Sequence, residues 1–262
     1  MLGVLLSCTM TVFEQTPQAP PQEGVGAELS AELMWQAMSL ERYLEKVDRA
    51  EAFYEPILKK KDSSKPLIVV LGGSSSGGMR RPDEPTLFWP DWLAKGLPNY
   101  EVQSLAFGGA TTWHLNKLME RLDVRAHTCI LYAGHNDRMR SAPKQSLGSL
   151  ERKEDPQTQA FAYWVDVDDA HVYLDEMALR CGYLVAMEEY RHPDDGEVKA
   201  FARLLMRHPK VVHLEAVHFL DKYGPKVVLQ DQIHLNPYGH EILGSWIAEE
   251  LDTIWKENEK RD

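Results

Sequence analysis

Short apolar runs alternate with stretches of helical periodicity through most of this sequence. The first run, Leu67-Ile-Val-Val-Leu71, is bounded by Pro66 and by Gly72-Gly73, which is typical of a strand buried on both faces of a parallel sheet. Further strand-like runs lie at 100–107, 128–132, 183–187 and 211–214, and helical patterns lie at 86–95, 112–122, 170–181 and 197–208. This alternation predicts an α/β fold, a three-layer α/β/α sandwich with a mainly parallel sheet and right-handed crossovers.

Four polar, glycine-containing or acidic segments are expected at one edge of this sheet. In open parallel sheets, ligands bind beyond the carboxyl ends of the strands. Three of the segments directly follow predicted strands, and the fourth precedes the last predicted helix. They are Gly72-Gly-Ser-Ser-Ser-Gly-Gly78, Phe107-Gly-Gly-Ala-Thr-Thr112, Ala133-Gly-His-Asn-Asp137 and Asp231-Gln-Ile-His234. The candidate catalytic residues are therefore gathered at a single rim.

The first segment offers a serine nucleophile on a tight turn. Its small residues, from Gly72 to Gly78, let a substrate approach the backbone closely. The run lacks the Gly-Lys-Ser/Thr ending of a phosphate-binding loop, the spacing of a dinucleotide-binding loop and the G-x-S-x-G elbow of α/β-hydrolases. By itself, a Gly/Ser turn after a strand is more often only a turn.

The last segment offers a base together with the residue that orients it. Asp231, three residues before His234, can accept a hydrogen bond from the imidazole Nδ1–H, fix the tautomer and stabilise the imidazolium. The middle segments offer neutral donors to a developing oxyanion, namely the Gly109 backbone N–H and the Asn136 side-chain amide. Taken singly, each of these residues also fits an ordinary turn or surface loop.

Together and in order, the four segments resemble the four sequence blocks of the SGNH hydrolases, also called the GDSL esterase/lipase family. The resemblance covers about residues 67–251. The matched residues are Ser74, Gly109, Asn136 and His234. Four ordered blocks are far more specific than any one of them, and they imply the flavodoxin-like α/β fold of that family.

The resemblance also implies a role for each matched residue. Ser74 would be the nucleophile, His234 its general base and Asp231 the residue that orients the base. The N–H groups of Ser74 and Gly109 and the side-chain amide of Asn136 would form the oxyanion hole.

The sequence departs from the family pattern at two positions that are neither nucleophile nor base. The Asp of the usual Gly-Asp-Ser is Gly73 here, and the Asn often found before the second-block glycines is replaced around Ser104. Ser75 and Ser76 are rival nucleophiles, which the alignment of the blocks disfavours. His240 is a rival base, and its place inside the last predicted helix favours a structural role.

The predicted activity is that of a serine esterase that hydrolyses a carboxylic ester through an acyl-enzyme, with no metal or organic cofactor. A short-chain ester or a carbohydrate O-acetyl group is the preferred substrate, followed by lipid esters. Trp89, Trp92, Trp113 and Tyr132 are candidates for stacking on a sugar ring, and packing in the core is their alternative role. Two other functions fit the same residues: an O-acyltransferase acting on a sugar hydroxyl, and a catalytically silent binding module of the cell envelope.

Charge and cysteine content exclude several other classes of protein. With 29 basic and 40 acidic residues, the formal net charge of −11 disfavours binding to nucleic acid or to anionic lipid surfaces. The cysteines, Cys8, Cys129 and Cys181, have no metal-ligand spacing, and their odd number cannot form a complete set of intramolecular disulfides.

Two segments are expected before the hydrolase domain, which spans residues 63–262. Residues 1–26 resemble a bacterial lipoprotein signal and tether, in which Leu5-Leu-Ser-Cys8 is the cleavage box and Cys8 takes the lipid. This predicts a lipid anchor at Cys8 and a location in the cell envelope; a frayed, ordinary N-terminus on a cytoplasmic protein is the alternative. Residues 27–62 have a helical pattern, and the polar stretch 138–156 is expected to be a surface loop that overhangs the site.

Overall fold

The computed structural model describes residues 40–60, 64–79, 86–138, 153–154, 161–162, 170–190, 196–231 and 233–258. The chain divides into two compact units, residues 1–37 and 38–262, and every described residue belongs to the second. The predicted signal-like segment, Cys8 and most of the predicted 138–156 loop lie outside the described residues. Within the described ranges, no helix is long and apolar enough to cross a membrane.

Five parallel strands form the central sheet, in the order β2-β1-β3-β6-β7. Their bounds are β1 (Leu67–Gly72), β2 (Glu101–Ser104), β3 (Ala126–Ala133), β6 (Cys181–Glu188) and β7 (Val211–His213). These strands lie where the apolar runs predict them, so the mainly parallel sheet is confirmed. A separate antiparallel pair joins β4 (Lys153–Glu154) to β5 (Phe161–Ala162).

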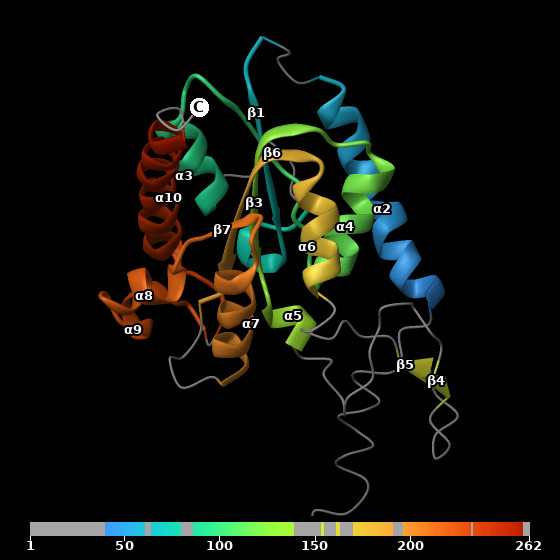
Figure 1. The fold of residues 1–262 in the computed structure, drawn as a ribbon. Helices are drawn as coiled ribbons and strands as arrows, with labels where there is room; N and C mark the ends of the chain where they lie inside the picture. The colour runs from blue at the N-terminus through green and yellow to red at the C-terminus, as the bar shows by residue number, and fades with distance from the viewer. Residues whose placement is uncertain are drawn as a thin grey trace, which may run out of the picture. The chain divides into compact units, whose positions relative to one another are not determined.

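Helices cover both faces of this sheet, as Figure 1 shows for the labelled elements. One core contains residues of α2 (Leu40–Leu58), α4 (Thr112–Arg121), α6 (Ala170–Ala178) and α7 (Gly196–Arg207). The core on the opposite face contains residues of α3 (Trp89–Gly96), α8 (Ala216–Asp221), α9 (Pro225–Val228) and α10 (Pro237–Asn258). The predicted three-layer α/β/α sandwich is therefore confirmed.

The two helical layers explain why the run at 67–71 is apolar at every position. In β1, Val69 and Leu71 belong to one core while Ile68 and Val70 belong to the other, and all four side chains are fully buried. Successive side chains of a strand point to opposite faces, so a strand between two helical layers has no solvent-facing position. Each such aliphatic side chain contributes about 1.5–3 kcal/mol through burial.

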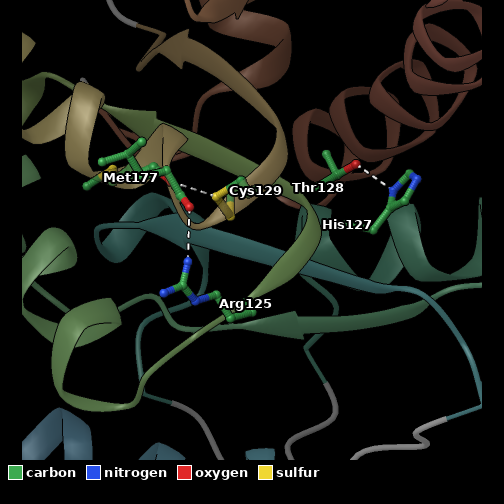
Figure 2. Close-up of a disulfide and its surroundings, with 7 residues drawn as sticks. Arg125, His127, Thr128, Cys129 and Met177 are labelled. Atoms are coloured by element: carbon green, nitrogen blue, oxygen red, sulfur yellow. Dashed lines mark hydrogen bonds between the residues drawn. A yellow bond between two sulfur atoms is a disulfide. The ribbon is translucent and has the colours of Figure 1, made fainter. Parts of the chain in front are cut away.

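A disulfide joins Cys129 in β3 to Cys181 at the start of β6 (Figure 2). Its Cys181 sulfur lies 3.0 Å from the backbone oxygen of Met177 in α6, so the bridge sits where β6 follows that helix. On the adjacent residues of β3, the Nδ1 atom of His127 and the Oγ1 atom of Thr128 lie 2.9 Å apart. The cysteine count in the sequence did not identify this pair.

The order of the strands creates a switch point at the centre of the sheet. From β1 the chain crosses to β2 on one side and then returns to β3 on the other side of β1. The connections at the carboxyl ends of β1 and β3 therefore diverge, and ligands of such folds bind beyond this point of the sheet. The first and third predicted catalytic segments follow these two strands.

Candidate active site

Ser74 begins a 3-10 turn, η1 (Ser74–Ser76), directly after β1 and Gly73. The turn is tight because a Cβ on Gly72 would stand 2.2 Å from Ser76 Oγ, a contact that only glycine avoids. Gly77 ends the turn with a positive φ of 98°. Ser74 is exposed in this arrangement, as a nucleophile must be.

The structure brings Ser74, His234 and Asp231 together although 160 residues separate the first two. Ser74 Oγ lies 3.0 Å from His234 Nε2. His234 Nδ1 lies 2.7 Å from Asp231 Oδ2. With its proton on Nδ1, the imidazole donates to the carboxylate and leaves Nε2 to accept the serine proton. This is the nucleophile, base and orienter geometry that the sequence motif predicts.

The Asp231 carboxylate is fixed by its own loop. Its Oδ1 atom accepts hydrogen bonds of 2.7 Å from the backbone N–H groups of Ile233 and His234. Partial burial by itself would raise the pKa of Asp231, but the hydrogen bonds from the His234 backbone, the His234 ring and Ile233 outweigh it and lower the pKa to about 2. The orienting residue is therefore ionised throughout the neutral range.

The start of α10 holds the His234 loop in place. Asn236 is the N-cap residue, because its Oδ1 atom accepts a hydrogen bond from Gly239 N–H at 2.8 Å. The Asn236 side chain also donates to the backbone oxygen of Val227 at 2.7 Å, which ties the loop to α9. Pro237 then occupies the first helical position, where no N–H is needed.

The two rival nucleophiles and the rival base lie in the protein interior. Ser75 and Ser76 are buried, and Ser76 Oγ accepts a hydrogen bond from Trp89 Nε1 at 3.2 Å. His240 is buried in α10, where its Nδ1 accepts from the Trp89 backbone N–H at 3.4 Å and its ring contacts Phe88 edge-on. These contacts give Ser76 and His240 structural roles and leave Ser74 with His234 as the exposed pair.

Asn136 lies in the short helix α5 (His135–Arg138), just beyond β3. Its side-chain nitrogen donates a hydrogen bond to the backbone oxygen of Ala110 at 2.8 Å. An amide nitrogen carries two hydrogens, so a second N–H of Asn136 is left for a substrate oxygen. The same nitrogen would stand 2.8 Å from a Cβ on Gly73, which places it beside the residue that precedes the nucleophile.

Gly109 follows β2 and has a positive φ of 69°. A side chain here would be strained, and its Cβ would stand 2.9 Å from Nζ of Lys46, which reaches over from α2. Glycine therefore keeps the backbone of the second segment close to the rim of the site. No sequence motif singles out Lys46.

A buried carboxylate joins the second and third segments. Asp137 is fully buried, and its Oδ1 accepts hydrogen bonds from the backbone N–H of Thr112 at 3.0 Å and from the Thr112 hydroxyl at 2.7 Å. Thr112 is the first residue of α4, where a carboxylate both caps a free N–H and suits the helix dipole. Asp137 and Asn136 therefore fix α5 to the loop that carries Gly109.

Helix α2 also reaches the site, through Tyr54. The Tyr54 hydroxyl donates to the backbone oxygen of Ala106, and it lies 3.3 Å from the backbone oxygen of Gly78. These two carbonyls belong to the loops after β2 and β1, so one hydroxyl braces both. The sequence predicts a helical segment here but contains no signal for this contact.

The aromatic residues proposed to stack on a sugar ring are mostly core residues. Trp89, Trp113 and Tyr132 are at most 3% exposed, so their ring faces are not available to a substrate. The stacking role is therefore wrong for these three residues, and packing in the core, the alternative stated for them, is correct. Trp92 is half-buried, and the Lys95 ammonium lies 3.8 Å from its ring centroid.

Glu189 is a buried carboxylate close to the site that the sequence motifs did not identify. Glu189 directly follows β6, is 4% exposed, and accepts a hydrogen bond from the backbone N–H of His135 at 2.9 Å. An acidic residue just beyond a predicted strand was the available signal, since 183–187 was already identified as a strand. Within the described residues, no group of three His, Cys, Asp or Glu side chains is arranged to hold a metal ion.

Solved structures of hydrolases share this fold. Axe2, an acetylxylan esterase from Geobacillus stearothermophilus, is 15% identical, with 69% of this chain and 91% of that chain covered at a TM-score of 0.50. A lipolytic protein of the G-D-S-L family from Desulfitobacterium hafniense DCB-2 is 14% identical, with 71% and 99% covered at 0.51. LAE5, an α/β hydrolase enzyme from the metagenome of Lake Arreo, Spain, is 17% identical, with 71% and 95% covered at 0.50.

The chain therefore shares the fold of these solved hydrolases, a three-layer α/β/α sandwich around a parallel sheet. No protein-family model matches the sequence, and no curated protein matches it.

Proposed function

We propose that this protein is a serine esterase that hydrolyses short-chain or carbohydrate O-acetyl esters. The observation that carries the proposal is the chain of contacts from Ser74 Oγ to His234 Nε2 at 3.0 Å and from His234 Nδ1 to Asp231 Oδ2 at 2.7 Å. A silent binding module has no physical need for an exposed serine, a base and an ionised orienter in this geometry. The fold shared with an acetylxylan esterase and a G-D-S-L lipolytic protein supports the same reaction class.

The proposed reaction has two halves. In the first, His234 takes the Ser74 proton, the serine oxygen attacks the ester carbonyl, and the carbonyl oxygen becomes an oxyanion held by Asn136 and the N–H groups of Gly109 and Ser74. The bond to the alcohol then breaks, and His234 returns its proton to the leaving oxygen. In the second half, water gives a proton to His234 and attacks the acyl carbon. The bond to the Ser74 oxygen then breaks, His234 returns the proton to that oxygen, and the acid is released.

A small acyl group on a large polar alcohol suits the described part of the site. Ser74 is exposed, and the side chains of His234 and Asp231 are 30% and 48% exposed. An open triad leaves room for a bulky alcohol such as a sugar. Two surface hollows in the described part of the chain lie away from Ser74, one between α2 and α4 and one between β7, α8 and α10.

The test is release of p-nitrophenol from acetate, butyrate and longer p-nitrophenyl esters by wild type and by Ser74→Ala. We expect hydrolysis that falls with acyl length and that is lost in the variant. Folded wild type that cleaves none of these esters would contradict the esterase proposal. Product formation only in the presence of a sugar acceptor would instead identify an O-acyltransferase, which uses the same acyl-enzyme.

We further propose that the protein works in the cell envelope, with a lipid anchor at Cys8. The disulfide between Cys129 and Cys181 supports this location, because such bonds persist in oxidising compartments and are rare in the cytoplasm. Metabolic labelling with a palmitate analogue should label wild type and not Cys8→Ala. Equal labelling of both, or labelling of neither, would contradict the anchor.

A further inference from the structure

Gly73 occupies the position where the family pattern has an aspartate. Two polar side chains lie close to it: Asn136, which follows β3, and Glu189, which follows β6. A Cβ on Gly73 would lie 2.8 Å from Asn136 Nδ2 and 3.4 Å from Glu189 Oε1. The first contact is closer than real Cβ atoms come to other atoms, so a side chain at residue 73 would displace the Asn136 amide from this place. The space is taken by an amide and by a carboxylate that comes from the end of β6.

Glu189 is held rigidly in this position. Its backbone N–H donates to Ala133 O at 3.0 Å, which fixes it to the end of β3. Its Oε2 accepts from the backbone N–H of His135, the residue before Asn136. At 4% exposure, the carboxylate has little access to water, and a buried carboxylate requires polar partners of this kind.

We propose that Glu189 is a positioning residue for the oxyanion hole, and that it supplies from β6 the carboxylate that residue 73 lacks. An ionised carboxylate attracts the NH₂ end of a neighbouring amide and repels its oxygen end. Ala110 O accepts a hydrogen bond from the same nitrogen and selects the same orientation. Glu189 therefore keeps the nitrogen of Asn136, rather than its oxygen, directed at the site, while its bond to His135 holds the backbone of α5.

This inference rests on the proposed esterase function, and a double-mutant cycle tests it. Glu189→Gln keeps an acceptor for His135 but removes the charge, and we expect kcat to fall by about tenfold with KM within about twofold of wild type. In the Asn136→Ala background the same substitution should change kcat by less than about twofold, because the amide on which it acts is gone. Equal effects of Glu189→Gln in both backgrounds would overturn the proposal.

Glu188→Gln is the matched control, since it makes the same change one residue earlier. Glu188 is also buried, but its Oε2 lies 2.7 Å from His213 Nε2, away from Asn136. We expect this variant to keep the wild-type kcat. Thermal melts of all variants show which are folded. If Glu189→Gln does not fold, Glu189→Ala, which leaves room for water at His135, takes its place in the cycle.

A second measurement does not depend on catalysis. The side-chain amide signal of Asn136 in an NMR spectrum, identified by its loss in Asn136→Ala, should shift in Glu189→Gln and stay unchanged in Glu188→Gln. An unshifted signal in Glu189→Gln would refute the positioning role even if the protein is an esterase. A wild type with no esterase activity and a shifted signal would refute the proposed function while supporting the role of Glu189.

Discussion

Replacing Asn136 by alanine removes one donor from the proposed oxyanion hole and leaves the contacts of Ser74, His234 and Asp231 intact. Asn136 donates to Ala110 O and has a second N–H for the substrate, whereas the Ser74–His234 contact involves neither group. The variant should therefore form the acyl-enzyme slowly rather than not at all. The proposed oxyanion hole keeps two other donors in this variant, the N–H groups of Ser74 and Gly109.

The expected size of the effect follows from these contacts. Loss of one preorganised oxyanion donor lowers kcat by about 10² to 10³, or about 2.7–4 kcal/mol of transition-state stabilisation. KM should stay within about threefold, because the donor acts on charge that develops only in the transition state. The variant should also lose about 1–3 kcal/mol of unfolding free energy, because Ala110, 2% exposed, loses the hydrogen bond to its carbonyl.

The assay combines steady-state hydrolysis of p-nitrophenyl acetate with urea denaturation of the same preparations. Asn116→Ala is the matched control, because Asn116 is a buried asparagine of α4 that donates to Glu176 outside the site. We expect the control to lose some stability and to keep the wild-type kcat. An Asn136→Ala variant with unchanged kcat, or with raised KM alone, would refute the assignment of Asn136 to the oxyanion hole.

Three further outcomes are expected. Intact-mass analysis with and without reduction should show one disulfide, and replacing both Cys129 and Cys181 by alanine should cost about 2–4 kcal/mol of unfolding free energy for a bridge of sequence separation 52; a single mass in both conditions would contradict the bridge. The Tm of wild type should exceed that of Asp231→Asn, and this difference should shrink as pH falls from about 4 to about 2. The reason is that the folded-state pKa of Asp231, about 2, lies below its ordinary value of 3.8, and only the ionised carboxylate stabilises the fold. A Tm difference that grows in acid would contradict the lowered pKa. Ser76→Ala should lose about 1 kcal/mol through its bond to Trp89 and keep kcat within about twofold; a complete loss of activity would make Ser76 a rival nucleophile again.

The layers of the fold were predictable because burial on two faces leaves a direct mark on the sequence. A strand such as β1, with Val69 and Val70 in different cores, must be apolar at consecutive positions, and that run is visible without a structure. The place of Ser74 was predictable for a related reason. Parallel strands deliver the loops that follow them to one rim, and Ser74 comes directly after β1. His234 follows α9 and not a strand, so its contact with Ser74 was expected only from the order of the four sequence blocks.

Contacts between side chains of different elements were not predictable from local pattern. The Trp89 side chain has a large apolar ring and a single polar N–H, so it could lie either at the rim of a site or in the core. Only the packing of α10 against α3 decides that it is buried. Glu189 acquires its role from the short distance between the ends of β3 and β6, which no spacing in the sequence encodes. The pairing of Cys129 with Cys181 depends in the same way on how α6 returns the chain to the sheet.

The most direct test of the central claim is fluorophosphonate labelling of the native protein, followed by peptide mapping. The triad geometry predicts one adduct per chain, on Ser74, that is lost in Ser74→Ala and strongly slowed in His234→Ala. An adduct on Ser75 or Ser76, or a folded protein that takes no label, would contradict the assignment of Ser74 as an activated nucleophile.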